Sequence, residues 1–120
     1  MAWKKIVLSD DLVRTYCAGC QATDVPNNSE VRFLRLTVPS GKTLYVVAAS
    51  IYPSNIANHI VEVYNLTDTA QVYGTNGGAN GWQEGALGSV GEGKDVVFRV
   101  NNTSGAERTG AVAMIAFQIY

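Results

Sequence analysis

The chain has 120 residues, of which 47% are hydrophobic and 16% are charged, and its formal net charge at pH 7 is −1. This length corresponds to one domain that can bury a core without metals or disulfides, and the composition is not that of a disordered chain. The weak net charge provides no basic surface for nucleic acid. The longest apolar run, residues 44–51, is too short to span a membrane as a helix.

Residues 1–24 are expected to form an N-terminal arm and a connector. The chain opens with Met-Ala-Trp-Lys-Lys-Ile-Val-Leu, in which Trp3, Ile6 and Leu8 indicate a short extended arm or an edge strand. This apolar run is too short for the hydrophobic region of a secretory signal peptide. We therefore expect synthesis in a cytoplasm.

The segment 10–24 is ambiguous. Asp10-Asp11 can cap a short helix that continues through Tyr16, or the segment can be irregular. A loop with strong turn residues, Val25-Pro-Asn-Asn-Ser29, follows it.

From Glu30 onward, the chain is predicted to consist of β-strands separated by turns. The expected strands are residues 31–38, 43–52, 59–66, 71–73, 83–90, 94–100 and 111–120. Turn signals recur at roughly 8–12-residue intervals, and almost no helix is indicated. Residues 25–120 are therefore predicted to form a single all-β domain, a jelly-roll-like β-sandwich of about eight strands.

The inward-facing residues of several strands follow from the alternation of apolar and polar side chains. They are Leu34, Leu36 and Val38, then Val61 and Val63 with Glu62 outward, and then Val96, Phe98 and Val100. Between the first two strands, Pro39-Ser-Gly-Lys42 is predicted to be a tight turn, because proline presets φ and glycine supplies φ > 0.

The last ten residues, 111–120, contain no charge, glycine or proline. Both faces of this strand are apolar, as are both faces of the strand 43–52, whereas a two-layer sandwich covers only one face of each sheet. We therefore expect the other face to meet a second subunit, in a homotrimer packed around one sheet. The residues predicted for the oligomer interface or core are Val112, Met114, Ile115, Phe117, Ile119 and Tyr120.

Cys17-Ala-Gly-Cys20 is the motif that most suggests chemistry. A structural zinc site needs four ligands, whereas the chain has two cysteines and one histidine, His59. A redox pair of the thioredoxin type needs a helix in a βαβ unit. We expect two reduced, partly buried thiols, with a metal shared between molecules or a redox role as the alternative. His59 is expected to be a hydrogen-bonding residue at a strand edge.

The segment 74–93 holds 8 of the 12 glycines. A phosphate-binding loop would need a helix after it, and this segment leads into a strand. The carboxylates are scattered, so that no spacing singles out an acid–base pair. We therefore expect a protein that is not an enzyme and that has no catalytic residue, cofactor or metal, with a small enzyme as a further alternative.

Two aromatic residues lie in or beside the glycine-rich segment, Tyr73 and Trp82. Trp82 can fold back to cap the sandwich, or it can anchor a contact with another protein. Together with Tyr73, it can also stack on a sugar ring. These three interpretations remain open.

Two stretches carry a resemblance to known proteins. Met1-Ala-Trp-Lys-Lys-Ile-Val resembles the start of many small virion proteins of tailed bacteriophages, and Val38-Pro-Ser-Gly-Lys-Thr-Leu-Tyr-Val-Val is similar to head decoration and fibre-tip modules. The resemblance implies a jelly-roll virion protein, usually trimeric, at local three-fold junctions on the outside of an icosahedral head. It carries over no catalytic or ligand-binding residue.

On this basis, we expect a capsid decoration, or cement, protein whose partners are the major capsid protein lattice and its own copies. Trp3 and Ile6 of the arm, or Trp82 of the glycine-rich segment, are the expected contacts with the shell. The alternative is a receptor- or glycan-binding tail fibre or tip module that uses Trp82 and Tyr73.

Overall fold

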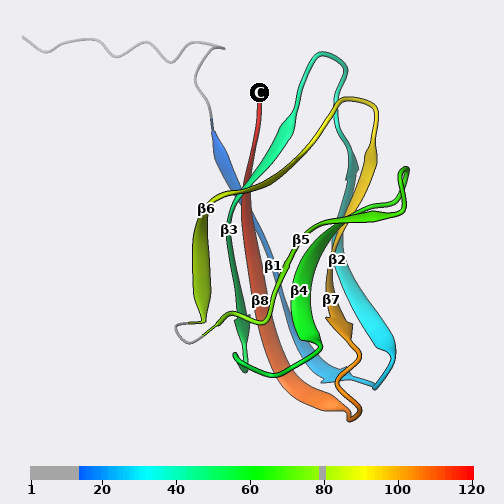
Figure 1. Ribbon diagram of the computed structural model, residues 1–120, viewed down its shortest axis with the longest axis vertical. Helices are drawn as coiled ribbons and strands as arrows, with labels where there is room; N and C mark the ends of the chain where they lie inside the picture. Colours follow the sequence, from blue (N-terminus) through cyan, green and yellow to red (C-terminus); the bar gives the residue numbers. More distant parts are fainter. Residues whose placement is uncertain (1–13, 79–80) are drawn as a thin grey trace, which may run out of the picture.

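Eight antiparallel strands form two four-stranded sheets that pack face to face (Figure 1). The computed structural model describes residues 14–78 and 81–120, and no helix is found among them. The strands are β1 (Thr15–Val25), β2 (Ser29–Thr37), β3 (Leu44–Tyr52), β4 (His59–Asn65), β5 (Ala70–Thr75), β6 (Trp82–Val90), β7 (Asp95–Asn102) and β8 (Arg108–Ile119).

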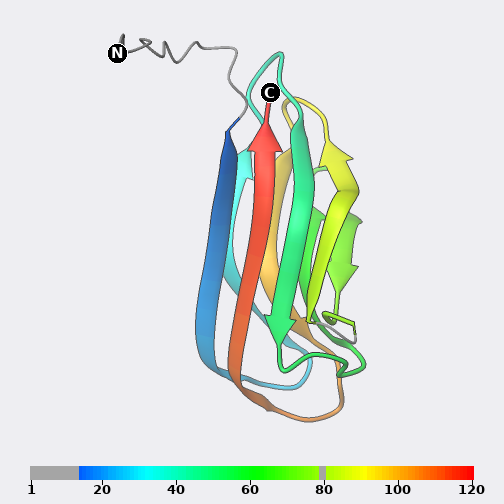
Figure 2. The ribbon, with the colours of Figure 1, turned by 90° about the vertical axis from the view of Figure 1, so that its left-hand side faces the viewer.

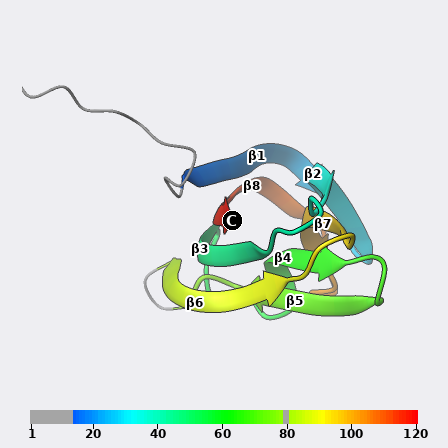
Figure 3. The same cartoon turned by 90° about the horizontal axis from the view of Figure 1, so that it is seen from above.

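The strand order is that of a jelly roll, as the sequence predicted. Sheet A has the order β1-β8-β3-β6, and sheet B has the order β2-β7-β4-β5. Figure 2 shows β1, β8 and β3 side by side in sheet A, and Figure 3 shows the two layers from above, with β1 beside β2 and β6 beside β5. Both ends of the described chain, β1 and β8, therefore lie next to each other in one sheet.

The core lies between the sheets and is built from the inward-facing residues of both. Phe98 of β7 packs edge-on against Phe117 of β8, with ring centroids 5.0 Å apart, and links the two layers. Other fully or almost fully buried members are Val25, Val38, Leu44, Val46, Ala49, Ile51, Val61, Val63, Val96, Val100, Ala111, Ala113 and Ile115. The inward residues predicted for β4 and β7 are thus confirmed.

The connector expected over residues 10–24 was wrong from Thr15 onward, because β1 occupies Thr15–Val25 and pairs with β8 over most of its length. The sandwich therefore begins with β1 instead of at residue 25. The strand was missed because its residues are mostly small and favour no strand by themselves. Their small inward side chains lie opposite Ala111 and Ala113 in the register, so packing against β8 decides the conformation.

The other expected strands are present, with ends that differ by a few residues. The strand expected near residues 83–90 in the glycine-rich segment is β6. The turn before β3 is formed as predicted: Gly41 has φ +74°, and the Lys42 amide donates to the Pro39 carbonyl oxygen at 3.1 Å. The loop expected between the last two strands is shorter, because β7 extends to Asn102 and β8 begins at Arg108.

Candidate assembly surface

The outward-facing side of sheet A is almost free of charge. Its cross-strand register brings together rows of side chains from all four strands. These rows are Thr15–Gln118–Tyr45–Ser89, Cys17–Ala116–Ala48–Glu84, Gly19–Met114–Ser50–Trp82 and Gln21–Val112–Tyr52. We call these residues, with Tyr120, the sheet A outer face. Glu84 is the one charged residue in this set.

Large apolar side chains on this face are in contact with solvent. Tyr52 is 69% exposed, Tyr120 51%, Val112 47% and Trp82 40%. They are four of the five large hydrophobic side chains that are exposed in the described part of the chain. A single exposed apolar residue needs no explanation, but a cluster on one sheet face is typical of an interaction site.

A hollow of about 410 Å³ interrupts the sheet A outer face near its β6 edge. It lies where β6 bulges: Val46 pairs with Gly88 and Ala48 pairs with Glu84, so three residues of β6 face one residue of β3. One wall of the hollow includes Tyr45 and Tyr120, whose rings stack with centroids 4.6 Å apart. The face is therefore contoured, with a depression beside two stacked tyrosine rings.

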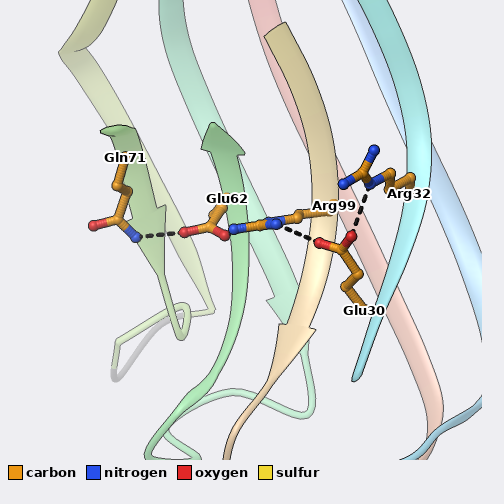
Figure 4. Close-up of polar contacts among 5 residues, drawn as sticks. All are labelled: Glu30, Arg32, Glu62, Gln71 and Arg99. Atoms are coloured by element: carbon orange, nitrogen blue, oxygen red, sulfur yellow. Dashed lines mark hydrogen bonds and ion pairs between the residues drawn. The ribbon is translucent and has the colours of Figure 1, made fainter. Parts of the chain in front are cut away.

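The outward-facing side of sheet B has the opposite character. Figure 4 shows a row of polar contacts that crosses β2, β7, β4 and β5. Arg99 donates to the carboxylates of both Glu30 and Glu62. Arg32 Nε donates to Glu30 at 2.8 Å, and Gln71 Nε2 donates to Glu62 at 2.8 Å. Each of these charges has an internal partner.

The electrostatics of this row favour the charged forms of Glu30 and Arg99. Partial burial disfavours the charged form of Glu30, but hydrogen bonds from Arg32 and Arg99 outweigh this cost and lower the pKa of Glu30. Burial also acts to lower the pKa of Arg99, whereas its bonds to Glu62 and Glu30 give a net rise in that pKa. The Arg99 guanidinium also lies 4.4 Å from the centroid of the Tyr64 ring.

Further ion pairs extend this polar surface. The Arg35 guanidinium lies 2.6 Å from the Asp95 carboxylate, and Lys94 Nζ lies 2.9 Å from Asp68. The hydrogen bond from Arg35 lowers the pKa of Asp95. Sheet B thus presents a face of paired charges, and the two sides of the sandwich are chemically unlike.

The residues predicted for the oligomer interface or core are divided between the core and the sheet A outer face. Ile115 and Phe117 point into the core, and Ile119 packs against it. Val112, Met114 and Tyr120 belong to the sheet A outer face. Trp3 and Ile6, predicted to contact a capsid shell, lie outside the described residues.

The structure does not bring Tyr73 and Trp82 together on one surface. Tyr73 is in β5, opposite Val63, and packs against the core. Trp82 is in β6 on the sheet A outer face, and its Nε1–H donates to Glu84 at 3.3 Å. A sugar-stacking platform made by these two rings is therefore not formed, and Trp82 does not cap the sandwich.

Cys17 and Cys20 lie on opposite faces of β1, since residues three apart on a strand point in opposite directions. Cys17 is exposed on the sheet A outer face, and Cys20 is half-buried against the core. Burial raises the pKa of the Cys20 thiol, although a hydrogen bond with the Ala113 backbone opposes the shift. The two thiols cannot chelate one ion together within one chain.

His59 begins β4 but is not at an exposed edge. Its side chain is fully buried, and neither ring nitrogen has a hydrogen-bond partner among the described residues. Burial, and to a smaller degree the charge of Arg108, lowers the pKa of His59. The expectation of a hydrogen-bonding residue was therefore wrong, because the ring is packed as an apolar one.

Sequence reasoning missed Tyr45 and Tyr52, which lie in the first and last rows of the sheet A outer face. Among residues 14–78 and 81–120, no group of three or more histidine, cysteine or acidic residues is placed to hold a metal ion. The same residues include no helix long and apolar enough to cross a membrane.

No protein-family model, curated protein or solved structure matches this chain.

Proposed function

We propose that this protein is a structural assembly module that associates with its own copies, as a homotrimer, through the sheet A outer face. The observation that carries the proposal is the contrast between the two sides of the sandwich. Sheet B carries on its outer side charges that are paired with one another, whereas sheet A exposes Tyr52, Val112, Trp82 and Tyr120. Depletion of charge together with aromatic enrichment is the composition of an interface centre.

The cost of leaving this face in water supports the same conclusion. Burying apolar surface contributes about 25 cal/mol per Å² removed from water, so four large side chains from each partner provide a substantial driving force. The β-bulge of β6 and the hollow beside Tyr45 and Tyr120 offer a shaped surface into which a neighbouring side chain fits. A closed ring of three copies would cover the sheet A outer face of each copy. Because the ring is closed, no such face would remain free to add further copies.

The resemblance of residues 1–7 and 38–47 to small virion proteins provides the proposed setting. In that setting, the trimer decorates and cements the outside of an icosahedral phage capsid, with the major capsid protein lattice as its partner. Binding only to the assembled lattice would stabilise it by mass action. Three linked copies would add weak contacts through multivalency.

Self-association is tested by sedimentation equilibrium on the wild-type chain and on two matched lysine variants. Val112→Lys places a charge on β8 of the sheet A outer face, beside Tyr52, and Thr37→Lys places one on the outer side of β2 in sheet B. The two replaced side chains have nearly the same shape. We expect a trimer for the wild type and for Thr37→Lys, and a folded monomer for Val112→Lys. A wild-type monomer, or a trimer that Val112→Lys leaves intact, would overturn the proposal.

The virion setting has its own test, the copy number of the protein in purified particles relative to the major capsid protein. Hundreds of copies in a fixed ratio to the shell subunit are expected for a decoration protein. A few to a few tens would instead indicate a fibre or tail component. Absence from the particles would overturn the virion setting but not self-association.

A further inference from the structure

The edge strands of the two sheets differ in how they are protected against pairing with another strand. β1 and β6 are the edges of sheet A (Figure 2), and β2 and β5 are those of sheet B. A register shift interrupts the pairing of β2, β5 and β6 with their neighbours, and such bulges are one way in which proteins protect an exposed edge. β1 pairs with β8 from Thr15 to Val25 in a single register. It is therefore the one regular edge strand among these four.

The composition of β1 gives it no other protection. Charged residues and proline commonly block an edge strand, but residues 15–23 contain neither. β2, by comparison, carries Glu30, Arg32 and Arg35. Apart from the ladder with β8, the backbone of residues 15–24 makes no backbone hydrogen bond to another described residue. The free side of β1 can therefore accept one more antiparallel strand.

Two opposite charges stand at the ends of this uncharged stretch, Arg14 before it and Asp24 after it. Both residues are exposed, and neither forms an ion pair with a described residue. Because ten positions separate them, a strand that continues to Arg14 carries both side chains on the same face. An antiparallel copy of β1 centred on Gly19 sets Arg14 of each chain opposite Asp24 of the other. The charge pattern of this edge is therefore complementary to itself.

We propose that the free edge of β1 pairs with β1 of a second copy, about a two-fold axis at Gly19, so that the two A sheets become one continuous sheet. In this register, Tyr16, which is 48% exposed, lies opposite the small Ala22 of the second copy, and Cys17 lies opposite Gln21. The contact uses the edge of sheet A and goes beyond the proposed trimer, which uses the outer face. One strand from each copy is a small interface of the weak class, so we expect it to form at higher protein concentrations than the trimer.

Disulfide trapping tests the register of this weak contact. Gln21→Cys places a thiol opposite Cys17 of the second copy, and directly opposite residues on antiparallel strands lie within the range of a disulfide. Within one chain, positions 17 and 21 are about 13 Å apart along the strand, which is too far for a bond. With oxidised glutathione as the oxidant, we expect a covalent dimer joined between positions 17 and 21. In the control Cys17→Ser/Gln21→Cys, we expect several-fold less dimer, because position 21 then has no thiol opposite it.

A charge exchange in the Gln21→Cys chain tests the same register independently. Asp24→Arg sets like charges opposite each other at both ends of the pairing and should lower the yield of covalent dimer several-fold. Adding Arg14→Asp reverses both charges and should restore the yield. Mass spectrometry of the dimer identifies the linked positions. Absence of a dimer, a random mixture of linkages, or a yield that the charge variants leave unchanged would overturn the proposal.

A further variant separates this contact from the trimer. All of the chains above carry Trp82→Lys, which places a charge on β6 at the opposite edge of sheet A and opposes association through the sheet A outer face. We expect the covalent dimer to form equally with and without this change. A dimer that forms only when Trp82 is retained would assign the cross-link to the sheet A outer face, which contradicts pairing through the β1 edge and leaves the proposed trimer intact.

Discussion

Arg99 and Glu62 lie directly opposite each other on β7 and β4, and the Arg99 Nε–H donates to the Glu62 carboxylate. The Glu62 side chain is only 4% exposed although it points away from the core. Arg99, Gln71 and the neighbouring strands cover it. A carboxylate placed outward by the strand pattern is thus buried by its own hydrogen-bond partners.

Removal of Arg99 should therefore be costly. Arg99→Met leaves Glu62 as a covered charge without its cation, and we expect the free energy of unfolding to fall by about 3 kcal/mol, the lower end for a buried pair. Urea denaturation measures this loss. The matched control is Arg35→Met, which breaks the exposed pair with Asp95 and should change stability little. Equal losses for the two variants would contradict the assigned burial of Glu62.

His59 should make stability depend on pH. Its pKa in the folded chain lies below the ordinary value of 6.5, so the unfolded chain takes up the proton first as the pH falls. The contribution of His59 is fully present above pH 6.5, and it is lost as the pH falls from there through the folded-state pKa. We expect urea midpoints to fall less between about pH 7 and about pH 5 in His59→Leu than in the wild type. Identical pH profiles would contradict this sign.

Replacing Gly88 by a larger residue should destabilise the fold. A Cβ atom at this position would lie 2.8 Å from the Val72 carbonyl oxygen of β5, where the edges of the two sheets meet. Gly88→Ala should therefore cost about 1–3 kcal/mol in thermal or urea unfolding, because the strand backbones must move apart. Gly91→Ala is the control, since a Cβ atom there would meet no neighbouring strand or side chain within 4 Å, and it should have little effect or stabilise slightly.

The two thiols should react at different rates. Cys17 is exposed, whereas Cys20 is half-buried and has a raised pKa, so a thiol-specific reagent should modify Cys17 first. Cys17→Ser should remove the fast phase. If copies associate through the sheet A outer face, Val112→Lys should accelerate the reaction of Cys17 and leave Cys20 unchanged. Mass spectrometry of the modified chain measures both rates.

Most of the sandwich could be predicted from the alternation of apolar residues. Strands such as β4 and β7 carry valine and phenylalanine at every second position, and this pattern identifies both the strand and its buried face. β1 could not be found in this way, since its alanines, glycine and cysteines have no strong preference. Its structure depends on a partner strand that lies almost at the other end of the chain.

The sheet A outer face could be predicted only in part. The two-sided apolar character of β3 and β8 led to the prediction of a covered face, with Val112, Met114 and Tyr120 among the candidates, and these three residues lie on the sheet A outer face. Simple alternation puts Tyr45 and Tyr52 on opposite faces of β3, because seven positions separate them. The β-bulge between Val46 and Ala48 shifts the phase by one residue and turns both outward. A bulge depends on the partner strand, so a single strand pattern does not indicate it.

The position of β8 between β1 and β3 sets the order of events during synthesis. Sheet B needs no residue beyond Asn102, but sheet A remains divided until β8 has left the ribosome. At elongation rates of about 5–20 residues per second, the synthesis of β8 follows that of β1 after roughly 5–20 s, and β8 is the hydrogen-bonding partner of β1. During that interval, the apolar sides of β1 and β3 are available to chaperones, and premature termination within β8 would release a chain with one finished layer and one open one.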